Sequence, residues 1–79
     1  MKYKKGMYLL DKSDGEIIKL LERVAIYPDI KIEKWRFKLV KTPYKYPPGN
    51  KYRYLGTGSK SKKWKQLTKI DLILLGVKT

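Results

Sequence analysis

Alternation of apolar and polar residues runs through most of the chain and predicts strands. A short apolar run over residues 7–10 is followed by Lys-Ser-Asp-Gly at 12–15, a sequence typical of a tight turn. We therefore expect residues 16–21 to pair back as the second strand of a hairpin. The alternative is a helix over residues 16–25, because the same apolar residues also have helical spacing and Ser13 could cap it.

The clearest strand covers residues 30–40. Trp35, Phe37 and Leu39 alternate with charged residues there, whereas the two isoleucines before them have the opposite parity. A change of phase inside a strand is typical of a bulge or a bend, which we expect near residues 33 and 34. Bent strands of this kind let a small sheet curl into a barrel.

The second half of the chain is divided by turn-forming residues. Three prolines, a glycine and an asparagine make residues 43–50 a loop, since proline cannot occupy a central strand. Residues 51–55 alternate basic or aliphatic with aromatic side chains, which predicts a strand with one basic and one aromatic face. Residues 56–63 are expected to form a basic, mobile loop, and 64–67 the next strand.

A short helix is expected at the end of the chain. Thr68 is suited to the N-cap, Asp71 to the third helical position, and Gly76 to the position after the last turn. A final strand is the alternative for this segment. If the helix forms, its spacing predicts a buried face made of Ile70, Ile73 and Leu74.

These elements predict a mainly β fold, a small SH3-like or OB-like barrel of about five strands with a short C-terminal helix. If residues 16–25 are helical, the fold is instead α+β, with that helix packed on a three-stranded meander. At 79 residues, the chain is expected to form a single small basic domain over residues 1–79. Its size, charge and architecture are similar to those of the chromatin proteins of thermophilic archaea, although no motif aligns.

Charge is distributed unevenly along the chain. Residues 1–33 hold seven basic and six acidic residues, whereas residues 34–79 hold thirteen basic residues and a single acid, Asp71. Almost all of the net charge of +13 therefore lies in the second half. A field of one sign costs stability through self-repulsion, so it indicates a polyanionic partner rather than a requirement for solubility.

Composition argues against several classes of function. Cysteine and histidine are absent, which removes disulfides, thiolate metal ligands and the commonest general base. No group of acid, base and nucleophile can be assembled, so we expect no enzyme, no cofactor and no metal site. No apolar run approaches the roughly 20 residues of a membrane span, so we expect a cytoplasmic protein, nucleoid-associated if it binds DNA. The bias toward Lys, Glu, Ile and Tyr matches the composition of hyperthermophile proteins, archaeal or viral. Coding by a genome of low G+C content gives the same bias.

Cations and aromatic rings alternate most densely between residues 34 and 65, a window without any acid. Lys and Arg neutralise phosphates, and exposed rings stack on bases. The candidate nucleic-acid-binding residues are Arg36, Lys38, Lys41, Tyr44, Lys45, Tyr46, Lys51, Arg53, Lys60, Lys62, Lys63, Trp64 and Lys65.

The aromatic candidates divide into two groups. Tyr44 and Tyr46 lie on the proline loop and are expected to be exposed, whereas Tyr52 and Tyr54 are expected to be buried if the basic residues between them face solvent. Trp64 has two readings: it stacks on a base or enters a minor groove, or it fills the end of the core while the neighbouring lysines reach into water.

The sequence thus favours a non-catalytic nucleic-acid-binding protein, most readily of double-stranded DNA and of the chromatin or viral-accessory kind. Seventeen Lys against three Arg predict little sequence specificity, because Arg is the preferred reader of bases and of narrow minor grooves. One alternative is a module that binds RNA or single strands, for example on the ribosome. Another is a small protein-binding inhibitor or adaptor that docks on an acidic partner.

Overall fold

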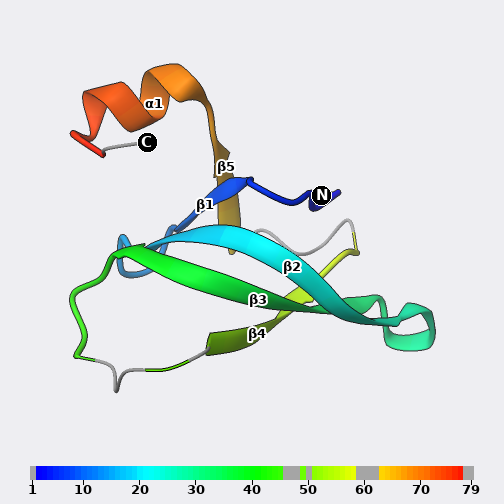
Figure 1. The fold of residues 1–79 in the computed structure, drawn as a ribbon. Helices are drawn as coiled ribbons and strands as arrows, with labels where there is room; N and C mark the ends of the chain where they lie inside the picture. Colours follow the sequence, from blue (N-terminus) through cyan, green and yellow to red (C-terminus); the bar gives the residue numbers. More distant parts are fainter. Residues whose placement is uncertain (1, 46–48, 50, 59–62, 78–79) are drawn as a thin grey trace.

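A computed structural model describes residues 2–45, 49, 51–58 and 63–77 (Figure 1). The chain folds into five strands and one helix: β1 (Tyr8–Asp11), β2 (Ile17–Tyr27), β3 (Ile32–Lys41), β4 (Lys51–Gly56), β5 (Trp64–Leu67) and α1 (Lys69–Leu74). A single 3-10 turn, Pro28–Ile30, joins β2 to β3. The expected mainly β fold with a short C-terminal helix is confirmed.

The strands form one antiparallel sheet in the order β4-β3-β2-β1-β5. Every strand contributes to one core cluster, and Leu55 of β4 packs in the same cluster as Trp64 of β5 although these strands lie at opposite ends of the order. The sheet is therefore curled around its core. Within the described residues β4 and β5 do not pair, so the sheet does not close into a barrel.

The turn between β1 and β2 confirms the hairpin and excludes the helix over 16–25. Asp11 accepts hydrogen bonds at Oδ1 from the backbone N–H and the hydroxyl of Ser13, at 2.9 and 2.6 Å. Gly15 follows with φ of +79°, a conformation that glycine adopts without steric cost. These local bonds reverse the chain, and Leu9 then pairs with Ile18.

β3 itself has no bulge at residues 33 and 34, because it pairs with β4 without interruption over 32–37. The irregularity at this place in the sheet belongs to β2, where Val24 has no direct partner between Arg23, which pairs with Trp35, and Ala25, which pairs with Lys34. Two further irregularities fall at Leu21 of β2 and Val40 of β3. The two isoleucines gave a false signal for physical reasons: Ile30 belongs to the 3-10 turn, and Ile32 lies on the opposite side of the sheet from Trp35.

The helix α1 begins as expected but buries a different face. Thr68 and Asp71 form a capping box, in which the Asp71 N–H donates to Thr68 Oγ1 at 3.2 Å and the Thr68 N–H donates to Asp71 Oδ2 at 2.9 Å. The buried residue is Leu72, which packs against Ile17 and Leu67 in a second cluster. The expected buried residues are all exposed: Ile70, Ile73 and Leu74.

The second cluster defines two sides of the sheet. Leu9 of β1 packs in the main core, whereas its neighbours Tyr8 and Leu10 pack against the cluster beneath α1. Because side chains alternate along a strand, the main core and α1 lie on opposite sides. We call the core side the inner side and the other the outer side of the sheet.

Candidate nucleic-acid interface

A row of cations lies on the outer side of β3. Trp35 and Phe37 face the core, so Lys34, Arg36 and Lys38 point outward on the same strand. Residues two apart on a strand are separated by about 6.6 Å, so the three cations form a regular line. Lys34 was not among the residues singled out from the sequence, although it has the same parity as Arg36.

Tyr52 and Tyr54 of β4 flank this row and are exposed, which corrects the expectation that they are buried. Their exposed fractions are 48% and 59%. The reason is the register: Arg53 pairs with Trp35, which faces the core, so the tyrosines on either side of Arg53 must face outward. Arg53 and Lys51 consequently lie on the inner side rather than in solvent, and both are partly buried.

Contacts among these side chains fix their arrangement. The Lys34 ammonium lies over the rings of Tyr52 and Tyr54, 5.2 and 5.6 Å from the ring centroids. Tyr27 of β2 packs against Tyr54 with ring centroids 6.2 Å apart. We call this surface the basic–aromatic face; it consists of Tyr27, Lys34, Arg36, Lys38, Tyr52 and Tyr54.

One acid lies beside the basic–aromatic face. Glu22 of β2 pairs with Arg36 across the strands, and its Oε2 lies 3.4 Å from Arg36 Nε. The Glu22 side chain is 63% exposed and that of Arg36 is 34% exposed, so solvent screens the pair and it contributes little to stability. Arg36 therefore remains able to exchange this carboxylate for a phosphate.

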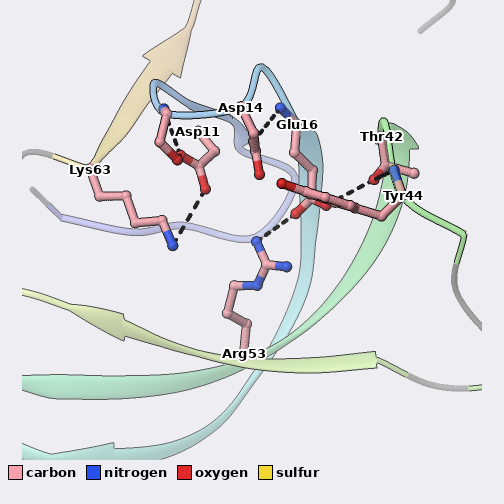
Figure 2. Close-up of polar contacts among 8 residues, drawn as sticks. Asp11, Asp14, Glu16, Thr42, Tyr44, Arg53 and Lys63 are labelled. Carbon is pink, nitrogen blue, oxygen red and sulfur yellow. Dashed lines mark hydrogen bonds and ion pairs between the residues drawn. The ribbon is translucent and has the colours of Figure 1, made fainter.

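Arg53 is held inside by Glu16 (Figure 2). Its Nη1 lies 2.7 Å from Glu16 Oε1, and the guanidinium lies over the rings of Phe37 and Trp64. Glu16 is 1% exposed and also accepts a hydrogen bond from the Thr42 hydroxyl at 3.0 Å. Arg53 was a candidate phosphate ligand, but the structure uses it to neutralise a buried carboxylate.

A second ion pair lies next to the first. Lys63 Nζ is 3.4 Å from Asp11 Oδ2, and Asp11 is buried (Figure 2). Burial alone would raise the pKa of Asp11, but the hydrogen bonds from Ser13 and the charge of Lys63 together hold that pKa below its ordinary value. We call Asp11, Glu16, Arg53 and Lys63 the ion-pair cluster.

Trp64 belongs to the core. It is 5% exposed, packs in the main cluster, and its ring is covered by Arg53 and Lys63 at 5.1 and 5.5 Å. Of the two readings left open by the sequence, the structure places Trp64 where a base has no access to its ring. The neighbouring Lys63 has an exposed side chain, as expected if Trp64 fills the end of the core.

The other sequence candidates are dispersed. Lys41, Tyr44 and Lys45 are exposed at and after the end of β3, and the ring of Tyr44 points toward Glu16 (Figure 2). Lys65 is exposed on β5 near Asp71, where it contributes to lowering the pKa of that carboxyl after the larger effect of the Thr68 hydrogen bonds. Candidates outside the described residues are Tyr46, Lys60 and Lys62.

Two further properties follow from the described residues alone. None of their Asp and Glu side chains gather in a group of three that could hold a metal ion. Their one α-helix, α1, has six residues and is too short to cross a bilayer.

Comparison with known proteins yields no relative: the chain matches no protein-family model, no curated protein and no solved structure.

Proposed function

We propose that this protein binds double-stranded DNA with little sequence specificity and without catalysis, through the basic–aromatic face. The observation that carries the proposal is the row of Lys34, Arg36 and Lys38 on one strand, flanked by two exposed tyrosines. A line of cations at regular spacing suits the regular charge of a phosphate backbone. Tyrosine hydroxyls and ring edges at the border of the row supply contacts to sugars and groove edges.

The arrangement of the rings favours a duplex over a single strand. A platform for unpaired bases needs open ring faces, but Lys34 lies over the rings of Tyr52 and Tyr54. The ring of Tyr54 also packs against Tyr27. These contacts make a preformed, cationic surface, which suits a ligand of fixed shape such as a double helix.

Low specificity follows from the kind of cation that is exposed. Two of the three cations in the row are lysines, which act as point charges, and the one arginine shares its guanidinium with Glu22. Arg53, whose bidentate guanidinium could read a base edge, faces Glu16 on the inner side. Phosphate contacts of this kind position a protein on DNA without reading its sequence.

Fluorescence anisotropy with matched duplex DNA, single-stranded DNA and RNA tests the proposal. If the three cations of the row each neutralise one phosphate, duplex affinity falls roughly 40-fold between 50 and 200 mM salt. Replacing Lys38 or Arg36 by Ala should lower the salt slope by about one unit each. The matched control is Lys12→Ala, which removes an exposed lysine from the turn between β1 and β2.

Three outcomes contradict the proposal. Tighter binding of single strands or RNA at equal salt would assign the face to those ligands. Equal losses for Lys12→Ala and Lys38→Ala would mean that binding follows net charge and not this face. Absence of nucleic-acid binding at moderate salt, together with recovery of one acidic protein in a pull-down, would favour the protein-docking alternative.

A further inference from the structure

A pocket of about 530 Å³ lies on the outer side of the sheet, where the end of α1 approaches β1, β2 and β3. Three lysines, Lys19, Lys38 and Lys41, and one tyrosine, Tyr8, supply its polar side chains. Apolar residues of β3 and the segment 75–77 form the rest of the wall. The volume falls in the range of small-molecule sites, which is roughly 300–1,000 Å³.

Two of these lysines are directly opposed. Lys19 on β2 and Lys38 on β3 are cross-strand partners, and like charges in that position destabilise a sheet. Three cations elsewhere in the fold, Arg36, Arg53 and Lys63, each have a carboxylate partner. Within the described part of the chain, no carboxylate comes within ion-pair distance of Lys19, Lys38 or Lys41, and none lines the pocket.

The surroundings of the lysines hold their charges in position. The Lys19 ammonium lies 5.5 Å from the centroid of the Tyr8 ring, which holds it against the pocket wall. Clefts lined by charges of one sign and by apolar walls focus the field and concentrate counter-ions. The N–H groups of Gly76 and Val77 donate to carbonyls of Ile73 and Leu72, so the ligand must be held by the side chains.

We propose that this pocket is a binding site for a phosphate group, held by Lys19, Lys38 and Lys41. An unbound pocket carries an uncompensated like-charge pair, and a phosphate removes the repulsion while forming charge-assisted hydrogen bonds. The phosphate has two possible sources, the backbone of a bound nucleic acid or a free phosphate compound. The first source rests on the proposed function, because Lys38 belongs to both the pocket and the basic–aromatic face.

Titration with inorganic phosphate, followed by amide NMR at constant ionic strength, tests the site. The expected result is a saturable shift of the amides of Lys19, Lys38, Lys41 and residues 75–77. The double variant Lys19→Gln with Lys41→Gln should weaken binding about tenfold, since two ionic contacts that are screened by solvent are lost. Lys12→Gln, at an exposed position outside both the pocket and the basic–aromatic face, should bind phosphate as the unchanged protein does.

A shift that spreads over all lysines without saturating, or one that the double variant leaves unchanged, would overturn the site. Repeating the titration after saturation with duplex DNA separates the two sources. If the duplex abolishes the phosphate shifts, a backbone phosphate occupies the pocket; if the shifts persist, the pocket takes a free phosphate. Because the first titration contains no DNA, failure of the proposed function leaves its result intact.

Discussion

The ion pair between Arg53 and Glu16 neutralises the more deeply buried of the two buried carboxylates. Glu16 is almost completely buried, while the Arg53 side chain is 23% exposed. Removing one partner of a buried pair leaves an uncompensated charge and costs about 3–5 kcal/mol. Because Arg53 keeps some solvent contact, we expect Arg53→Met to lower the unfolding free energy by about 3 kcal/mol in urea denaturation.

The control is the double variant Arg53→Met with Glu16→Gln, which removes the buried charge together with its partner. It should recover part of the loss, because a neutral amide is cheaper to bury than a carboxylate. If the unfolding free energy of Arg53→Met lies within about 0.5 kcal/mol of that of the unchanged protein, Arg53 is not required to stabilise the buried charge of Glu16.

Asp11 should make stability depend on acid pH. Its pKa in the folded protein lies below the ordinary value of 3.8, so the unfolded state binds more protons in that range. The stabilisation is fully present above the unfolded pKa and is lost as the pH falls through the folded pKa. The melting temperature of Asp11→Asn should therefore lie below that of the unchanged protein at pH 6, with a gap that narrows below about pH 4. A gap equally wide at pH 6 and pH 3 would contradict this assignment.

At the residue scale, alternation in the sequence identified β4 but assigned its two sides in reverse. A strand that alternates arginine with tyrosine fits either orientation, and burial of the aromatic side is the simpler expectation. The orientation depends on the pairing of Arg53 with Trp35 and on the distant carboxylate of Glu16. Neither contact is visible in the local sequence.

At the element scale, α1 offers a matched test of which helix face is buried. Leu72 is 4% exposed and Ile73 is 68% exposed, although the two are adjacent. Leu72→Ala should cost about 2 kcal/mol or more, because it removes the contact with Ile17 and Leu67. Ile73→Ala should stay within about 0.5 kcal/mol.

Denaturant unfolding and hydrogen exchange of the Leu72 and Leu75 amides measure this difference. If α1 detaches without global unfolding, the exchange of these amides should accelerate in Leu72→Ala and not in Ile73→Ala. Faster exchange in Ile73→Ala than in Leu72→Ala would indicate that the buried face is the one that helical spacing predicts.

The ends of α1 were predictable and its buried face was not. Capping is local: Thr68 and Asp71 satisfy each other's backbone N–H groups, and Gly76 follows with φ of +73°. The buried face depends on the direction in which the chain leaves β5 and on the contact of Val77 with the second cluster. A six-residue helix has less than two turns, so its apolar spacing cannot define one face.

The hairpin of β1 and β2 shows a similar division. Turn chemistry at 12–15 correctly outweighed helical spacing, because Asp11 and Gly15 act locally. The bulges at Leu21 and Val24 were missed, since they depend on the register between β2 and β3.

Replacing Glu22 tests whether the basic–aromatic face binds the duplex. Glu22→Gln should leave the unfolding free energy within about 0.5 kcal/mol, since the exposed pair with Arg36 contributes little. Duplex affinity should increase, because Arg36 no longer has to exchange a carboxylate for a phosphate, while the salt slope should stay about the same, since the number of phosphate contacts is unchanged. Asp29→Asn, in the 3-10 turn, is the control with the same change of charge. An equal gain from both variants would indicate a general effect of net charge.

At the scale of the whole molecule, seven acids stand against twenty cations, and nearly all of the acids have a polar partner. Six of the seven acidic residues hold a hydrogen bond or an ion pair within the fold: Asp11, Asp14, Glu16, Glu22, Glu33 and Asp71. Two of them are buried in the ion-pair cluster. The excess positive charge of the sequence is therefore not balanced by acids at the surface. The basic–aromatic face and the pocket lined by Lys19, Lys38 and Lys41 both lie on the outer side of the sheet.

The most direct test of the proposed interface is amide NMR of the protein titrated with a short DNA duplex at moderate salt. We expect the largest shifts at 34–38 of β3 and 52–54 of β4, while the turn at 12–15 is unaffected. Shifts confined to the 3-10 turn at 28–30 or to the exposed residues of α1, or shifts spread evenly over every lysine, would contradict binding through this face.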